Sequence, residues 1–173
     1  VKLICNHKNL GFAVATNQGL RLATGDYLLL LNSDTLIHGD VLTRSIEYMN
    51  AHPDVGMMGC KVLNPDGSTQ PTCSRYPTFT NLLLQTVAAN RVTSIAWSCR
   101  YQMLDWSRDK EREVEVISGC YLVTRRETLV DIGLLDESFF IYGEETDWCR
   151  RCADAGWRLM FTPIEAITHY GSG

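Results

Sequence analysis

The chain has 173 residues (19.5 kDa); 45% of them are hydrophobic and 21% are charged. This length suits one folded domain with a substantial core, because a chain of ~150 residues buries roughly 70% of its unfolded surface. The net charge of −4 does not provide the basic field that non-specific nucleic-acid binding needs, so we expect no nucleic-acid partner. The longest strongly apolar run, residues 27–31, is far shorter than the ~18 residues of a membrane-spanning helix.

Strand and helix signals alternate through the first half of the chain. The predicted strands are residues 2–5, 26–31 and 55–63. The predicted helices are residues 12–23 and 39–51, with Val41, Leu42, Ile46 and Met49 on the apolar face of the second. The run Asp-Tyr-Leu-Leu-Leu-Leu at 26–31 is typical of a strand buried on both faces. The sequence Asn-Pro-Asp-Gly at 64–67 is a strong turn signal.

The second half of the chain is less regular. Residues 72–109 give no clear pattern beyond an amphipathic stretch at 82–89, and residues 108–115 are predicted to form a charged, exposed turn. The remaining predicted strands are 114–124, 157–161 and 166–170, and the remaining predicted helices are 127–132 and 144–155. Strands that alternate with helices predict an α/β fold, with a mostly parallel, Rossmann-like sheet flanked by helices in one domain over residues 1–173.

Seven cysteines are scattered along the chain, an odd number set mostly among apolar residues. A secreted disulfide framework favours even counts in shorter chains, so we predict reduced thiols and a cytoplasmic location. Cys149 and Cys152 form a lone C-x-x-C within a predicted helix, with no second pair of ligands at zinc-binding spacing. Two small buried side chains one turn apart are favoured there over a redox pair.

Polar residues follow the apolar run at 26–31. Ligands of α/β proteins bind beyond the carboxyl ends of strands, and Asn32 and Asp34 offer oxygen ligands for a divalent cation such as Mg²⁺ or Mn²⁺. A turn or helix-capping role for Asp34 is an equally good interpretation of the sequence alone. His169 follows the last predicted strand, and its imidazole can complete a metal shell begun by Asp34.

Three carboxylates open the predicted helix at 144–155. A favourable interaction of a carboxylate with the helix dipole explains the presence of one or two of them. The apolar and aromatic run at 139–143 precedes them, and partial desolvation by such a run raises a carboxyl pKa, as suits a general base. Asp147 lies one turn before Arg151, so the two are predicted to form an ion pair. Glu144 or Glu145 is then the residue left for chemistry.

Several segments, taken together and in order, resemble a known family. They are Asn9-Leu10-Gly11-Phe12-Ala13, Asn17-x-Gly19, Gly25-Asp26-Tyr27-Leu28-Leu29-Leu30-Leu31-Asn32-x-Asp34, Gly143-Glu144-Glu145-x-Asp147-x-Cys149-x-Arg151, Ala155-Gly156-Trp157 and His169. This pattern is similar to the family 2 glycosyltransferases, and to their bacterial rhamnosyltransferase-like branch in particular. The resemblance runs through nearly the whole chain, and the combination is far more specific than any one motif.

The resemblance implies a GT-A fold and inverting transfer of a sugar from a nucleotide-sugar to a saccharide acceptor. It also implies that Asp34 is the last carboxylate of the family's metal-binding DxD motif and that His169 is its C-terminal metal ligand. Glu145 stands where the family has its presumed base, an Asp, so the choice between Glu145 and Glu144 stays open. The implied donor-binding residues are Asn9, Gly11, Phe12, Asn17, Asn32 and Asp34. The implied sugar- or acceptor-facing residues are Gly119 and Trp148.

The resemblance further implies a divalent metal cofactor, Mg²⁺ or Mn²⁺, and a dTDP- or UDP-sugar donor in surface-polysaccharide synthesis. A lipid-linked acceptor, a place at the inner face of the cell membrane, peripheral membrane contact and a homodimer are left open. The family begins with a nucleotide-binding strand and helix that precede the first matching residues here, so we expect an N-terminally truncated catalytic domain. A non-catalytic nucleotide- or sugar-binding remnant and a sugar nucleotidyltransferase are the alternatives.

Overall fold

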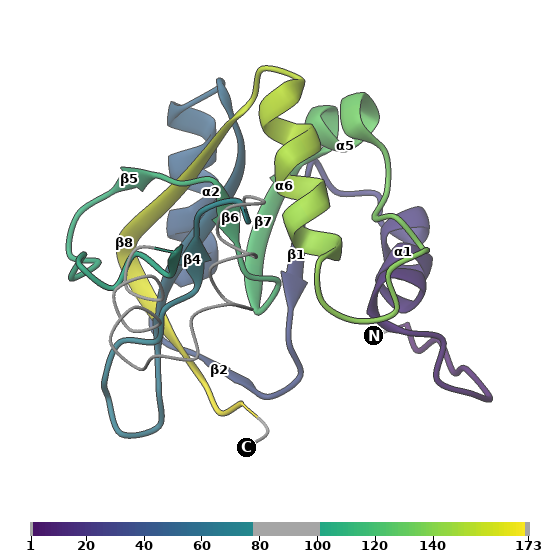
Figure 1. Cartoon of the computed structure of the whole chain (residues 1–173), viewed down its shortest axis with the longest axis horizontal. Coiled ribbons are helices and arrows are strands. Elements are labelled where there is room, and N and C mark those ends of the chain that lie inside the picture. The colour runs from purple at the N-terminus through teal and green to yellow at the C-terminus, as the bar shows by residue number, and fades with distance from the viewer. Residues whose placement is uncertain (1, 78–100, 172–173) are drawn as a thin grey trace, which may run out of the picture.

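A computed structural model describes residues 2–77 and 101–171 of the chain (Figure 1). Within these residues, six strands form one sheet and two form a second. The first sheet has the order β1 (Tyr27–Leu31), β7 (Tyr121–Arg125), β3 (Val55–Leu63), β8 (Arg158–His169) and β2 (Thr35–Ile37), with β5 (Arg112–Glu113) also paired to β8. The second sheet joins β4 (Cys73–Ser74) to β6 (Val116–Ile117). These two sheets contain the strands of the α/β fold predicted from the sequence.

The sheet is mixed, and this corrects the expectation of a mostly parallel one. Among the described strands only β3 and β8 run parallel, whereas β1 with β7, β3 with β7, β2 with β8 and β5 with β8 are antiparallel. Strand β7 inserts between β1 and β3 and opposes both of them. Hydrophobic periodicity marks where strands are, but the pairing direction depends on partners that are distant in sequence.

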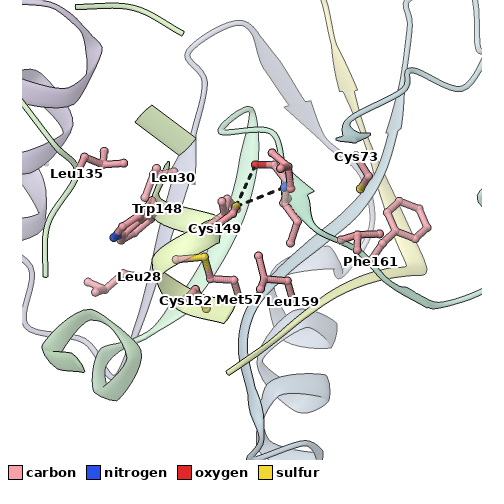
Figure 2. Close-up of a cluster of buried hydrophobic side chains, with 14 of the residues drawn as sticks. Leu28, Leu30, Met57, Cys73, Leu135, Trp148, Cys149, Cys152, Leu159 and Phe161 are labelled. Atoms are coloured by element: carbon pink, nitrogen blue, oxygen red, sulfur yellow. Dashed lines mark hydrogen bonds between the residues drawn. The ribbon is translucent and has the colours of Figure 1, made fainter. Parts of the chain in front are cut away.

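Four helices cover the sheet in the described part of the chain: α1 (Phe12–Leu22), α2 (Val41–Ala51), α5 (Arg126–Ile132) and α6 (Glu144–Asp154). One core contains buried side chains of α1 and α6, and the other contains those of α2. The neighbours Met57 and Met58 enter different cores, because successive side chains of a strand point to opposite faces. The sheet therefore separates two apolar layers, and Figure 2 shows the layer beneath α6.

The helices match their predicted ranges closely, but the inner face of α2 does not match. The buried residues of this helix are Val41, Ser45, Tyr48 and Met49, while Leu42 and Ile46 are each 43% exposed. The Ser45 hydroxyl can face the core because it forms a hydrogen bond of 2.9 Å with the Tyr121 hydroxyl. The buried stripe of α2 is thus rotated from the one predicted by side-chain hydrophobicity alone.

Four other predictions are corrected. Residues 2–5 form no strand; they pair with no strand of the described chain, and Leu3 is 83% exposed. The run 114–124 is interrupted at 118–120 between β6 and β7. The strands predicted at 157–161 and 166–170 are one strand, β8, whose pairing with β3 skips residues 163–165. Arg108 is buried, not exposed, because its guanidinium donates to two backbone carbonyls.

Other predictions hold. Strand β3 has the predicted bounds, and the Gly67 N–H donates to the Asn64 carbonyl across the predicted turn at 2.9 Å. The prediction that the run at 26–31 is buried on both faces is corrected: Leu28 and Leu30 on one face of β1 are buried, whereas on the other face Tyr27 and Leu29 are half-buried and Leu31 is 39% exposed. The amphipathic stretch at 82–89 lies outside the described residues. No helix in residues 2–77 and 101–171 is long and apolar enough to span a bilayer.

The described cysteines all carry free thiols, and Cys99 lies outside the described residues. Cys149 and Cys152 are fully buried in the α6 core (Figure 2). The Cys149 sulfur accepts a hydrogen bond from the Ile117 N–H at 3.5 Å. Burial raises the pKa of the Cys152 thiol to about 12 and raises that of Cys149 as well. Such thiols are poor nucleophiles, so the packing interpretation of this pair is supported.

Candidate active site

The pairing of β2 with β8 brings Asp34 to His169. Thr35 lies opposite His169 in the ladder, and the Tyr170 N–H donates to the Asp34 carbonyl at 2.9 Å. The carboxylate oxygen Oδ1 of Asp34 is therefore 3.3 Å from Nε2 of His169. These two residues are 135 positions apart in the sequence, and the edge of the sheet joins them near the C-terminus in Figure 1.

Two amides complete this cluster. Nδ2 of Asn32 lies 3.2 Å from Nε2 of His169, and Oε1 of Gln70 lies 2.8 Å from Nδ1. The His169 side chain is 15% exposed and that of Asp34 is 39% exposed, so the cluster is open on the aspartate side. Sequence reasoning missed Gln70, because an uncharged residue after a turn, outside any motif, carries no signal of its own.

Asp34 and His169 fit a divalent cation. Two ligands at right angles in an octahedral shell with bonds of ~2.1 Å lie about 3.0 Å apart, close to the observed 3.3 Å. A carboxylate and a neutral imidazole suit Mn²⁺, and Mg²⁺ is usually held by one or two carboxylates plus phosphate and water. No group of three or more His, Cys, Asp or Glu residues gathers anywhere in the described chain. The protein itself would thus provide only part of the coordination shell.

Glu145 faces a large cavity at the start of α6. The helix begins after Gly143, whose φ of +102° only glycine adopts readily. The cavity has a volume of about 1020 Å³, and Glu145 lines it together with residues such as Tyr76, Ser118 and Tyr142. Burial raises the pKa of Glu145, the neighbouring Glu144 carboxylate raises it further, and a hydrogen bond from the Gly119 N–H opposes the shift. A partly buried carboxylate of raised pKa beside a cavity is suited to accept a proton.

Glu144 occupies a different environment. Its side chain is 2% exposed, it is absent from the lining of the cavity, and its Oε2 has no hydrogen-bond partner within the described structure. The two candidates for the base therefore differ in access, because only the Glu145 carboxylate can meet a molecule in the cavity.

The loop at 118–120 connects the two halves of the site. Leu31, at the end of β1, pairs with Tyr121 at the start of β7, and the Asn32 N–H donates to the Cys120 carbonyl at 3.2 Å. Gly119 lies against Glu145: a Cβ at this glycine would be 3.4 Å from the Glu145 Cγ. Asn32 and Glu145 thus flank one loop of three residues.

The cavity provides a second connection between the halves. It extends from Glu145 to Pro71, the residue after Gln70, and Gln70 contacts the ring of His169. In Figure 1, α6 begins beside β1, and β8 ends lower in the view, near the C-terminus. The lining of the cavity includes Glu145 and Pro71 but neither Asp34 nor His169. The Asp34–His169 pair is therefore connected to Glu145 only indirectly, through the loop at 118–120 and through Gln70.

Two residues assigned from the sequence to ligand binding are instead part of the interior. Trp148 is fully buried, its indole N–H donates to the Gly133 carbonyl at 2.9 Å, and its ring packs among Leu28, Leu30 and Leu135 (Figure 2). A ring enclosed in this way cannot face a sugar. The assignment failed because aromatic residues suit both cores and sugar faces.

Asn17 is also fully buried. Its amide donates to the Leu135 carbonyl at 2.8 Å and accepts from the Leu135 N–H at 3.0 Å. A further hydrogen bond of 3.0 Å joins this amide to Glu137. These bonds use the amide to fix α1 against the chain at 135–137, so its assignment to the donor is corrected.

The segment at 9–12 holds the loop that leads into α6. The Asn9 side chain accepts from the Gly11 N–H at 2.9 Å, and the Phe12 N–H donates to the Phe140 carbonyl at 2.9 Å. Gly11 has a φ of +86°, and a Cβ there would lie 2.5 Å from the Phe140 carbonyl oxygen. The close approach that Gly11 allows is thus to Phe140. Nucleotide contact by Asn9, Gly11 and Phe12 stays a prediction.

The predicted ion pair of Asp147 with Arg151 is present. The Arg151 guanidinium lies 2.7 Å from the Asp147 carboxylate and also donates to the carbonyls of Ile132 and Leu134. It therefore joins α6 to the end of α5.

The chain matches a known protein family along its length. Residues 1–172 match the family described as "Glycosyltransferase like family 2". The chain is 24% identical to the N-acetylglucosaminyl-diphospho-decaprenol L-rhamnosyltransferase of Mycobacterium tuberculosis, over 98% of its own length and 59% of the relative's. It is 25% identical to the rhamnosyltransferase WbbL of Escherichia coli K12, over 94% and 59% of the two lengths. It thus spans 59% of either relative.

Solved structures share the fold. GalNAc-T7 with UDP, GalNAc and Mn²⁺ has a TM-score of 0.67 at 13% identity, over 99% of this chain and 32% of that one. The mannosyltransferase PcManGT of Pyrobaculum calidifontis, in complex with GDP-Man and Mn²⁺, has a TM-score of 0.60 at 20% identity, over 97% and 39%. At these identities the likeness establishes the fold alone, and it is the GT-A fold that the sequence resemblance implied.

Proposed function

This chain belongs to the family described as Glycosyltransferase like family 2, and on that premise we propose that it is the catalytic part of an inverting glycosyltransferase. The reaction would transfer a sugar from a nucleotide-sugar to a hydroxyl of a saccharide acceptor. The observation that carries the proposal is the position of Glu145, which lines a cavity of about 1020 Å³ and lies against Gly119, in the loop whose Cys120 carbonyl accepts from the Asn32 N–H.

In this proposal, Glu145 is the general base. An acceptor in the cavity would place one hydroxyl at its carboxylate, which takes the proton as the oxygen attacks the anomeric carbon. The nucleoside diphosphate leaves from the opposite face, so the configuration inverts. The raised pKa of Glu145 supports this role, because a stronger base accepts the proton more readily near neutral pH. General-base catalysis of this kind contributes ~10²–10⁴-fold in rate.

Asp34 and His169 would hold a divalent cation, Mn²⁺ or Mg²⁺, in the part of the site that receives the diphosphate. Such a cation, when bound, neutralises charge that develops on the leaving diphosphate. Asn32 stands in place of the first acidic residue of the family motif, so one protein carboxylate serves where the motif has two. We infer from this a weaker affinity for the free metal and a larger share of ligands from the nucleotide.

For the substrates, we propose a rhamnosyl donor and an acceptor saccharide on a lipid diphosphate, used in surface-polysaccharide synthesis. The support is the naming of two relatives as rhamnosyltransferases, one of them for a decaprenol diphosphate-linked sugar. For the nucleotide part of the donor we propose a class only, a pyrimidine nucleoside diphosphate such as dTDP or UDP.

The test uses purified protein that contains this chain and measures release of nucleoside diphosphate from a panel of nucleotide-sugars. We expect Glu145→Gln to lower kcat ~10²–10⁴-fold while donor binding is retained, and Glu144→Gln to have a smaller effect. Glu47→Gln is the matched control, because Glu47 is exposed on α2 and bonded to Arg44. Transfer that survives in Glu145→Gln would exclude Glu145 as the base. Donor binding without any transfer by the parent would favour the non-catalytic binding module.

A further inference from the structure

Gln70 is held in place by the end of strand β3. Its N–H donates to the Val62 carbonyl at 2.8 Å, and Thr69 forms an isolated bridge with Leu63. Val62 in turn pairs with Ile167 in β8, two residues before His169. The chain that reverses at 64–67 therefore returns along the sheet and presents Gln70 to the His169 ring from a fixed backbone position.

Both amide contacts of His169 fit one tautomer of its neutral ring. The Gln70 carbonyl oxygen only accepts, so at 2.8 Å it requires a proton on Nδ1. The Asn32 amide nitrogen only donates, so at 3.2 Å it requires a lone pair on Nε2. The Asp34 carboxylate, 3.3 Å from Nε2, would favour a proton there instead. A proton on Nε2 would cost both amide contacts, of which the Gln70 contact, at 2.8 Å, is shorter than the Asp34 contact at 3.3 Å.

We propose that Gln70 is a positioning residue that holds His169 in the Nδ1–H tautomer, with the Nε2 lone pair directed at the cation site. A metal-binding nitrogen must be unprotonated, and the partner of the other ring nitrogen decides which nitrogen that is. In the free protein the Asn32 amide occupies the lone pair, and it must release it when a cation binds. This inference rests on the proposed role of His169 as a ligand.

Metal binding by this chain should depend strongly on Gln70, because the protein offers few ligands besides His169. Within the described residues, Asp34 and His169 are the charged or imidazole ligands of the cluster, and no third His, Cys, Asp or Glu joins them. Loss of the correct tautomer would therefore remove about half of the ligands that the protein provides. Changes to such supporting residues lower metal affinity ~10–100-fold in other proteins.

The first experiment reads the tautomer directly. The protein is labelled with ¹⁵N-histidine, and the ring nitrogens of His169 are observed without metal at alkaline pH, where histidine is neutral. We expect a protonated Nδ1 and an unprotonated Nε2 in the parent. We expect a shift toward the opposite tautomer in Gln70→Met, which keeps the length of the side chain and removes its acceptor. A parent ring protonated on Nε2 would overturn the proposal.

The second experiment measures binding of Mn²⁺ alone by electron paramagnetic resonance. We expect Gln70→Met to bind ~10–100-fold more weakly than the parent and Gln70→Glu, which retains an acceptor for Nδ1–H, to restore binding. Gln18→Met is the control, because Gln18, on α1, forms hydrogen bonds only with the exposed side chain of Asn6 among the contacts described for it. Parent-like affinity in Gln70→Met would contradict the proposal. Equal, weak binding by the parent and Asp34→Ala would refute the proposed metal site, while the ring spectra would still test the role of Gln70.

Discussion

Two glycines, one just before helix α1 and one inside it, should respond in opposite ways to an added methyl group. Gly11, just before α1, has φ 86° and ψ 167°, a conformation almost restricted to glycine. A Cβ there would lie 2.5 Å from the Phe140 carbonyl oxygen, so this carbonyl must move and lose its bond from the Phe12 N–H. Gly19, inside α1, has nothing within 4 Å of an added Cβ. Alanine should therefore be harmful at position 11 and harmless at position 19.

The magnitudes follow from these contacts. At Gly11 the backbone conformation costs ~1–3 kcal/mol for alanine and the lost hydrogen bond ~0.5–1.5 kcal/mol, which together give about 1.5–4.5 kcal/mol. Gly19→Ala should stabilise the protein by about 0.5–1 kcal/mol, because alanine replaces glycine in a helix interior. Gly67→Ala separates strain from collision: Gly67 has φ of +83° with no atom near the added Cβ, so we expect only ~1–2 kcal/mol of destabilisation.

Urea denaturation of the parent and the three variants gives the free energies of unfolding. The expected order of stability is Gly19→Ala, parent, Gly67→Ala and then Gly11→Ala. If Gly11→Ala is no less stable than Gly67→Ala, the close approach of Gly11 to Phe140 is refuted. Gly11→Ala should also lower transfer activity, because the displaced carbonyl belongs to the loop that leads into Glu145.

Further predictions concern Glu145, α6 and its core. Because burial and then the neighbouring carboxylate raise the pKa of Glu145, the acid limb of kcat/KM should lie above the ordinary value of 4.5, as a pH–rate profile can measure. The folded protein holds this proton more tightly than the unfolded chain, so the stabilisation is complete below the ordinary pKa and is lost as the pH rises through the raised one. Glu145→Gln should therefore be more stable than the parent at neutral pH in urea; lower stability there would contradict the burial of a charge. Arg151→Ala should destabilise by ~2–3 kcal/mol and Asp147→Asn by less than about 1 kcal/mol, because only the arginine change removes the hydrogen bonds to the carbonyls of Ile132 and Leu134. Equal losses of stability in the two variants would assign the effect to the ion pair. Trp148→Ala should cost ~3–5 kcal/mol of stability without a specific rise in the acceptor KM, and a rise in KM at unchanged stability would restore this residue to the sugar site.

Some residues of the candidate site could be assigned from the sequence, and others only from the structure. Asp34, His169 and Glu145 belong to segments whose order along the chain carries the family resemblance. The fold brings Asp34 to His169 and places Glu145 at a cavity. The difference in access between Glu144 and Glu145 could not be predicted, because adjacent residues share a motif, whereas in the structure Glu144 is buried and Glu145 lines the cavity. No sequence motif marks Gln70, because its proposed role depends only on its contact with the imidazole ring of His169.

Helix ranges, the bounds of β3 and the turn at 64–67 followed from the sequence alone. They depend on the spacing of apolar residues and on turn-forming residues a few positions apart, which the chain carries in any environment. The antiparallel insertion of β7, the exposure of residues 2–5, the rotated inner face of α2 and the burial of Trp148 and Asn17 were decided by tertiary structure. Each depends on which distant segment lies alongside, because pairing direction, burial and hydrogen-bond partners are properties of contacts between segments and not of either segment by itself.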